Sequence, residues 1–260
     1  MKKIELQNLK YSYGENQILK DINYEFNSGE LVGILGANGC GKSTLLKIMM
    51  GFLKKENGQI YLDEKKQEEF SILDFSKKVS FITQKSNQNI NFSVLELLKL
   101  GRVPHIKNNF KGLEEEDHQI VKEVIEELML QEFLYRDVNS LSGGEFQKIL
   151  LGRAFVQKGE VIFLDEPTSA LDMNHSLELL SLLLKKIKEE QLIGVIVIHD
   201  INLASLFCDK IVFIKDGKIK YSGVPKEVIK EEILKDVYGF NPEVLETKDG
   251  IFVLPKKEKI

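Results

Sequence analysis

The chain has 260 residues, of which 43% are hydrophobic and 29% charged, a composition typical of a globular protein with a sizeable core. Its formal charge of -4, from 36 basic and 40 acidic side chains, argues against a general nucleic-acid binder, which is usually basic. The 2 cysteines, Cys40 and Cys208, are expected to be free thiols. We see no signal peptide, and no apolar run approaches the roughly 20 residues that span a bilayer, so we expect any role at a membrane to come through a partner.

The N-terminal part of the sequence predicts strands. Residues 2–13 and 18–26 alternate polar and apolar positions around a GENQ turn, which is typical of an antiparallel pair. The short apolar run at 30–35 passes directly into a glycine-rich loop, and residues 42–52 then have helical spacing. This order of strand, loop and helix is the setting that a phosphate-binding loop requires.

The middle of the chain has a helical pattern. After strands predicted at 58–66 and 78–84, residues 94–132 show helical spacing, interrupted by the segment 101–119. In the clearest helix one face is apolar, formed by Ile120, Val121, Val124, Ile125 and Leu128. We therefore expect a helical lobe inserted into an α/β core.

Alternation of strands and helices resumes in the last third of the chain. Apolar runs at 161–165 and 193–199 flank an amphipathic helix at 175–190. Continuous apolar strands separated by helices predict a mostly parallel sheet that is covered on both faces.

The C-terminal segments predict a hairpin and then a helix. Residues 210–223 are expected to form two strands that turn at Asp216-Gly217. Residues 228–240 have helical spacing, and the end of the chain is expected to be frayed and charged.

A first glycine-rich loop, GANGCGKS at residues 36–43, fits the pattern G-x-x-x-x-G-K-[ST]. Glycines let backbone N–H groups point at phosphate oxygens, and the following helix presents its positive end to the same anion. We expect Lys42 to reach the β- and γ-phosphates and the Ser43 hydroxyl to bind Mg²⁺. A chance glycine turn is the alternative, but the flanking strand and helix argue against it. The expected nucleotide-binding residues of this loop are Gly36, Ala37, Asn38, Gly39, Cys40, Gly41, Lys42, Ser43 and Thr44.

Two acids follow a predicted buried strand. Asp165 ends that strand, where a carboxylate can hold Mg²⁺ through water. Glu166 is expected to point elsewhere, because neighbouring residues in a strand face opposite ways, and it suits orienting or deprotonating an attacking water. A solvated acidic pair is a common alternative, so these acids indicate catalysis only in combination with the phosphate loop.

Three further side chains are candidates on weaker grounds. His199 and Gln84 each end a predicted parallel strand, where ligands of α/β proteins bind, although an edge residue without function fits equally well. Tyr13 could stack on adenine, with Tyr11 as a competitor, but a tyrosine in a strand usually just packs.

A second glycine-rich turn, LSGGE at residues 141–145, precedes another helix start. The order of phosphate loop, Gln84, LSGGE, VIFLDEPTSALD and His199 resembles the ATP-binding cassette (ABC) family over almost the whole chain. In that family two copies pair head to tail, and the serine-glycine-glycine turn of one copy closes over the γ-phosphate held by the other. The helix start at this turn, with its backbone donors and positive dipole end, is consistent with that role.

The resemblance assigns roles to the motif residues. It implies nucleotide binding in trans by Ser142, Gly143, Gly144, Glu145 and Asp172, catalysis by Glu166, His199, Gln84 and Lys42, metal binding by Ser43, Gln84 and Asp165, and adenine stacking by Tyr13. The implied cofactors are ATP and Mg²⁺. The sequence departs from the family at Glu145, which stands where Gln is commonest, and we expect altered rate and not loss of function. Phe146 also occupies a position that is often basic in related importers.

The resemblance implies an α/β fold with a P-loop NTPase (RecA-like) core and a mostly parallel sheet. An antiparallel β subdomain at the N-terminus and an inserted α-helical subdomain complete it. We expect one nucleotide-binding domain over 1–260. Its approximate lobes are an α/β core with the β subdomain at 1–90 and 155–225, a helical subdomain at 91–154, and a C-terminal helix and tail at 226–260.

The segments GRVPH, LDMNHSLELL and VYGF resemble the ATPase subunits of iron-chelate importers, a group that also serves haem and cobalamin. This implies a peripheral bacterial protein at the cytoplasmic face of the membrane. The implied partners are a second copy of the chain, membrane permease subunits and, indirectly, an external binding protein. Docking to the permease is expected near Gln84 to Pro104, so that changes from Phe92 to Leu97 uncouple ATPase activity from transport.

Alternative functions remain open within the same family. A soluble ABC ATPase acting on nucleic acid or the ribosome would generally carry long coiled coils or two cassettes, and neither pattern is present. A scaffold that binds nucleotide without hydrolysis conflicts with the presence of Lys42, Glu166 and His199. An importer ATPase for another metal fits the residues as well, because the ATPase never touches the cargo.

Overall fold

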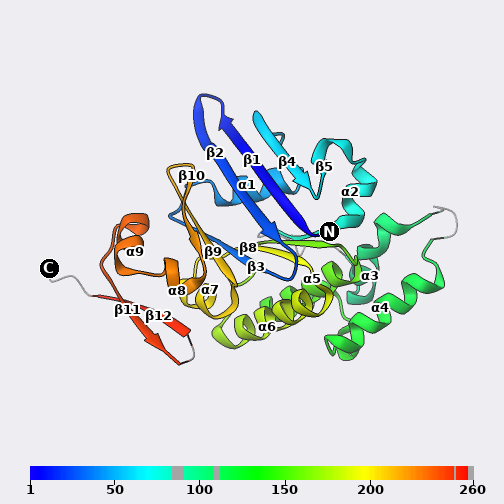
Figure 1. Cartoon of the computed structure of the whole chain (residues 1–260). Coiled ribbons are helices and arrows are strands. Elements are labelled where there is room, and N and C mark those ends of the chain that lie inside the picture. Colours follow the sequence, from blue (N-terminus) through cyan, green and yellow to red (C-terminus); the bar gives the residue numbers. More distant parts are fainter. Residues whose placement is uncertain (84–90, 108–111, 249, 257–260) are drawn as a thin grey trace. The chain divides into compact units, whose positions relative to one another are not determined.

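The computed structural model describes residues 1–83, 91–107, 112–248 and 250–256. The chain divides into two compact units, the first formed by Met1–Glu69 with Ile187–Ile260 and the second by Phe70–Lys186. Figure 1 labels the elements of both units, which we describe separately.

An antiparallel sheet forms the N-terminal part of the first unit. Its strand order is β2-β1-β4-β5, and the long hairpin pairs Tyr13 with Asn16 at its tip. Alternating burial places Ile4, Leu6 and Leu19 inside, as the period-2 pattern predicts. The strands are β1 (Lys3–Tyr13), β2 (Asn16–Asn27), β4 (Asn57–Leu62) and β5 (Lys65–Lys66).

The core of the first unit is a sheet segment with the strand order β10-β9-β3-β8. β3 lies between β8 and β9 and pairs in parallel with both, whereas β10 is antiparallel to β9. Every residue of β3 and β8 is buried, in agreement with the continuous apolar runs. These strands are β3 (Leu31–Leu35), β8 (Ile193–Val197), β9 (Lys210–Lys215) and β10 (Lys218–Gly223).

Helices and a C-terminal hairpin complete the described part of the first unit. α1 (Lys42–Met49) follows the phosphate loop, and α7 (Ile201–Phe207) follows β8. The expected C-terminal helix is split into α8 (Pro225–Val228) and α9 (Glu231–Tyr238). The tail then forms the hairpin β11 (Pro242–Thr247) and β12 (Gly250–Pro255). Residues 257–260, at the end that was expected to be frayed and charged, lie outside the described part.

The second unit contains a parallel strand pair and the helices of the middle of the chain. β6 (Val79–Ile82) and β7 (Val161–Asp165) pair in parallel, with Val79 opposite Val161. The helices are α2 (Ile72–Lys78), α3 (Val94–Lys99), α4 (Glu115–Glu127), α5 (Gly143–Val156) and α6 (Met173–Glu190), of which α6 runs on into the first unit. Among the residues that the structure describes, short 3₁₀ segments are interspersed: η1 (Gln67–Glu69) in the first unit, and η2 (Leu100–His105), η3 (Gln131–Phe133) and η4 (Val138–Ser140) in the second.

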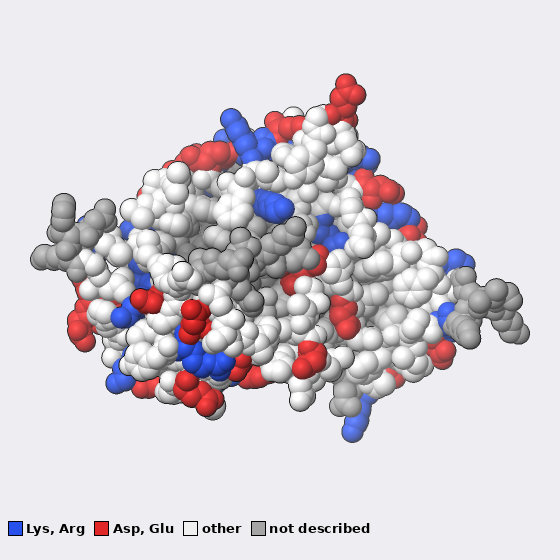
Figure 2. Space-filling model, turned by 180° about the vertical axis from the view of Figure 1, so that it is seen from behind, with Lys and Arg blue, Asp and Glu red and all other residues white. Residues whose placement is uncertain are grey.

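The expected fold class is thus confirmed: parallel strands, an antiparallel N-terminal sheet and a helical middle segment are all present. Within the described residues, no helix is both long and apolar enough to cross a bilayer. On the face drawn in Figure 2, blue Lys and Arg side chains are interspersed with red Asp and Glu side chains.

Candidate functional site

The phosphate loop runs from the end of β3 to the start of α1 and is tightly constrained. Gly36 has φ 148°, and a Cβ atom at this position would lie 2.3 Å from the carbonyl oxygen of Ile214. Lys42 begins α1 and is only 5% exposed. Its Nζ donates hydrogen bonds to the carbonyl oxygens of Gly36 (2.8 Å) and Ala37 (3.0 Å). The ammonium group is therefore held inside the loop, next to the positive end of the helix.

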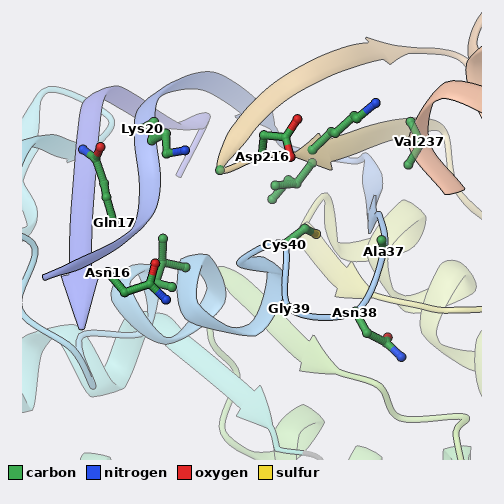
Figure 3. Close-up of a pocket in the computed structure, with 13 residues that line it drawn as sticks. Asn16, Gln17, Lys20, Ala37, Asn38, Gly39, Cys40, Asp216 and Val237 are labelled. Atoms are coloured by element: carbon green, nitrogen blue, oxygen red, sulfur yellow. The ribbon is translucent and has the colours of Figure 1, made fainter. Parts of the chain in front are cut away.

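A cavity of about 320 Å³ lies beside this loop in the first unit. Figure 3 shows that its lining comes from β2, from the loop, from the turn after β9 and from α9. The labelled side chains include Lys20, Cys40, Asp216 and Val237. The lining carries polar side chains, among them Asn16, Gln17 and Asp216, which suits a hydrophilic ligand next to the phosphate loop.

Tyr13 stands at the tip of the β1–β2 hairpin and is 50% exposed. Its ring meets that of Tyr11 edge to face, with centroids 4.9 Å apart. Burial raises the pKa of the Tyr11 hydroxyl, and Tyr11 is the less exposed of the pair. Of the two candidates for adenine stacking, Tyr13 thus presents the more accessible ring, supported from the side by Tyr11.

His199 follows β8, at the same sheet edge as the phosphate loop. β3 and β8 are parallel neighbours, and the Ile198 N–H donates to the Ile34 carbonyl oxygen at 3.3 Å. The side chain of His199 is exposed, and Asp200 next to it caps α7. The fold therefore brings His199 and the loop to the carboxyl ends of adjacent strands, where α/β proteins bind ligands.

The two acids lie in the second unit. Asp165 is the last residue of β7 and is 5% exposed. Glu166 is not part of the strand: it adopts φ 53° and is half-buried. The expectation that strand alternation sets its direction was wrong, because a left-handed turn intervenes. Such a backbone is uncommon for glutamate and costs about 1–3 kcal/mol, which makes this turn a feature that the surrounding structure must enforce.

The LSGGE turn begins α5 in the second unit. Ser142 is the N-cap residue, and its Oγ accepts the Glu145 N–H at 3.3 Å while the Glu145 carboxylate accepts the Ser142 N–H at 2.7 Å. Gly144 packs directly on the imidazole of His175, since a Cβ there would lie 2.4 Å from the His175 Cδ2. His175 Nδ1 is in turn 2.9 Å from the Asp172 carboxylate. The turn and the loop containing Asp172 are thus joined through one histidine.

The end of α9 also packs against the phosphate loop, which the sequence did not indicate. Tyr238 meets Phe213 of β9 edge to face, with centroids 6.2 Å apart. Burial raises the pKa of its hydroxyl, and a backbone hydrogen bond from Gly36 opposes part of that rise. The signal in the sequence was the VYGF segment, which we used only as a mark of the subfamily.

The remaining site expectations concern the metal and the thiols. Gln84 lies outside the described residues. Ser43 and Asp165 supply hydroxyl and carboxylate oxygens, the ligands that Mg²⁺ prefers, so these residues fit that ion chemically. Cys40 and Cys208 are free, as expected, and burial raises the pKa of both thiols, so neither is an activated nucleophile.

Comparison with known proteins decides the family. The sequence pattern of the ABC transporter family matches residues 19–169. The chain belongs to the ABC transporter family. The match covers both the phosphate loop and the LSGGE turn, and confirms the resemblance read from the motifs. ABC ATP-binding proteins are ATPases that drive transport, and this ABC protein is accordingly an ATP-binding ATPase.

Several relatives and solved structures are similar over nearly the whole chain. A petrobactin import ATP-binding protein of Bacillus anthracis, FpuC, is 33% identical, covering 98% of this chain and 93% of that protein. The iron(3+)-hydroxamate import ATP-binding protein FhuC of Bacillus subtilis is 34% identical, covering 94% of this chain and 91% of that protein. A metal-chelate type ABC transporter in an inward-facing conformation matches with TM-score 0.85 and 27% identity, covering 99% of this chain and 99% of that structure. A dimeric bacterial ABC transporter cassette matches with TM-score 0.73 and 30% identity, covering 85% of this chain and 98% of that structure.

Proposed function

We propose that this ABC protein is the ATP-hydrolysing subunit of an importer that takes up an iron chelate (siderophore), haem or cobalamin. The observation that carries the proposal is the near full-length similarity to petrobactin and iron(3+)-hydroxamate import proteins, in a chain whose phosphate loop and LSGGE turn are both formed. The protein acts at the cytoplasmic face of the membrane, with permease subunits and an external binding protein as partners.

The proposed roles combine the sequence motifs with the chemistry of the side chains. Lys42, already held at the loop, exchanges its carbonyl partners for phosphate oxygens when ATP binds. Ser43 and Asp165, with Gln84, hold Mg²⁺, which would neutralise charge on the phosphates. Glu166 orients and deprotonates the attacking water, and His199 donates to the γ-phosphate. Tyr13 carries the adenine.

Two chains assemble head to tail, so that the turn of one chain covers ATP held by the other. The reason is chemical: the turn offers a capped helix start with backbone donors, and each chain carries one such turn and one phosphate loop. A solved bacterial ABC transporter cassette that is 30% identical to this chain is dimeric, which supports pairing of two copies. ATP binding then closes the pair, and hydrolysis reopens it.

A purified Glu166→Gln variant tests the catalytic proposal. It should bind ATP, lose turnover by several orders of magnitude and form an ATP-dependent dimer visible by light scattering. Lys42→Ala should instead lose nucleotide binding. Glu178→Gln, an exposed acid on α6 paired with Lys148, is the matched control and should behave as the parent. A Glu166→Gln protein that remains monomeric and hydrolyses ATP at the parent rate would refute the proposal.

Docking to the permease is proposed to use the exposed apolar residues of the second unit near η2. Leu100 and Val103 are 40% and 50% exposed, whereas Val94 and Leu97 are buried in the core. Val94 and Leu97 belong to the segment that was first expected to couple ATPase activity to transport. Because these two side chains are buried, a charge introduced at either would unfold the protein. Leu100→Glu and Val103→Glu should abolish transport and preserve ATPase activity of the isolated chain, while Met129→Glu, also exposed, should do neither. Normal transport by the first two variants would contradict this docking surface.

Uptake measurements test the cargo. A deletion strain carrying the parent or the Glu166→Gln gene would be offered radiolabelled iron bound to a catecholate or hydroxamate siderophore, with haem, cobalamin and a bare metal salt in parallel. Uptake of an iron chelate that requires the parent gene is the expected result. Gene-dependent uptake of the bare metal alone would show an importer for another metal, the alternative left open by the sequence.

A further inference from the structure

Glu145 is an acid at a place where phosphate is proposed to approach, and its environment is unusual. It is the third residue of α5, and its Oε2 accepts the Ser142 N–H at 2.7 Å in a reciprocal capping box. Acids are favoured in the first helical turn, because free N–H groups and the helix dipole stabilise them. Hydrogen bonds from Ser142 lower the pKa of the carboxyl, so it is ionised at neutral pH. The LSGGE turn therefore carries a full negative charge.

Arg136 binds the other oxygen of this carboxylate. Its Nη1 donates to Glu145 Oε1 at 3.2 Å, and its Nη2 donates to the Ser140 carbonyl oxygen at 2.9 Å. The guanidinium group also lies 5.4 Å from the centroid of the Phe133 ring. One side chain therefore joins the irregular segment before the turn to the first turn of α5, in the fork geometry that suits arginine better than lysine.

Stability of the fold does not account for this pair. The two side chains are 39% and 29% exposed, and ion pairs at such exposure contribute little to folding. The pair matters more for charge. An ATP γ-phosphate is strongly anionic, and a lone carboxylate in the same turn would repel it across a site from which water is excluded. With Arg136 bound, the pair of Arg136 and Glu145 has no net charge. It resembles in this respect a glutamine at position 145, which is also uncharged.

We propose that Arg136 is a positioning residue for the LSGGE turn: it fixes the Glu145 carboxylate in the helix cap and cancels its charge, so that the turn can close over ATP held by a second copy of the chain. The inference rests on the proposed head-to-tail function. Arg136 touches neither ATP nor the reacting atoms in this account and acts through Glu145.

A double-mutant cycle tests this directly. Arg136→Gln would be made with Glu145 intact and in the Glu145→Gln background, all in Glu166→Gln protein, so that ATP-dependent dimerisation reports closure. The ATP concentration for half-maximal dimerisation should rise roughly fivefold to tenfold when Glu145 is present and less than twofold when it is replaced. Arg136→Lys should retain only part of the parent behaviour, because it keeps the charge but not the fork that also binds the Ser140 carbonyl oxygen. Lys148→Gln is the matched control. Lys148 lies on α5, like Glu145, and this change removes a comparable ion pair, between Lys148 and Glu178 of α6, so it should change dimerisation less than twofold.

Thermal unfolding separates positioning from a merely structural role. The midpoint of Arg136→Gln should stay close to that of Lys148→Gln, since both lose one exposed ion pair. An equal effect of Arg136→Gln in both Glu145 backgrounds would overturn the inference, and so would no effect in either. If the Glu166→Gln parent itself forms no dimer with ATP, the proposed function fails and this inference falls with it. A parent that dimerises while the cycle shows no coupling would overturn the inference alone.

Discussion

The contact between Gly144 and His175 gives a quantitative prediction about the LSGGE turn. In Gly144→Ala the new Cβ would lie 2.4 Å from His175 Cδ2, so the imidazole must move by about 1 Å to reach ordinary contact. Overpacking of this kind costs about 2 kcal/mol. The movement also disturbs the 2.9 Å hydrogen bond between His175 and Asp172, which is exposed and contributes little to stability. Alanine in place of glycine in a helix returns about 1 kcal/mol, so the net loss of unfolding free energy should be about 1 kcal/mol.

The neighbouring glycine is the matched control. A Cβ at Gly143 would meet only the Ala170 carbonyl oxygen at 3.8 Å, so Gly143→Ala should be neutral or slightly stabilising. Urea unfolding of both variants, repeated in a His175→Ala background, measures the effect. With the imidazole gone, Gly144→Ala should lose most of its penalty. Equal stability of the two alanine variants with His175 present, or a penalty that persists after His175→Ala, would refute the packing argument.

Three further predictions concern other groups. Arg102→Met should lower the free energy of unfolding by about 3–5 kcal/mol in urea, because it strands the buried Asp117 carboxylate, whose side chain is 8% exposed; a change below about 1 kcal/mol would contradict this. Hydrogen bonds from Lys220 and a second lysine lower the pKa of Asp236 to about 2, so stability present above pH about 4 should be lost as pH falls toward 2; acid unfolding of Asp236→Asn should lack that component. Because burial raises its thiol pKa, Cys40 should react with iodoacetamide more slowly than a free thiol at pH 8, and mass spectrometry would show fast labelling if this is wrong.

Much of the fold follows from local patterns that the sequence displays openly. The hairpin at Asp216-Gly217 was predictable because both residues tolerate positive φ, and they adopt φ 51° and 76°. The buried strands β3 and β8 were predictable from their continuous apolar runs. The phosphate loop was predictable because its residues satisfy backbone requirements that few other sequences meet, and the LSGGE turn because Ser142 is a typical cap at the start of a helix.

Other elements were missed where the pattern was weak or the deciding contact non-local. α2 exposes Ile72 by 91% and shows no apolar face, although Ser71 and Asp74 form a cap that could have marked its start. β12 buries Ile251 and Val253 alternately, but its partner strand is too charged to suggest a hairpin. The bond from Arg136 to Glu145 crosses an irregular segment, and no periodicity specifies such a contact.

The two glycine-rich motifs use glycine for different physical reasons, and this difference fits their proposed roles. Gly36 is required by its backbone: φ is 148°, and the loop lies against a carbonyl oxygen of β9. Gly144 is already helical, as the second residue of α5, and is required for room against His175. A phosphate cradle must curl so that several N–H groups converge on one anion, and left-handed backbone does this. A turn that closes over an anion held by another chain needs instead an ordinary helix start. It must pack closely on neighbouring residues of its own chain and carry no side chain that would clash with the second copy. Substitution of Gly36 should therefore impair ATP binding by the single chain. Substitution of Gly143, which touches little within its own chain, should impair only ATP-dependent pairing.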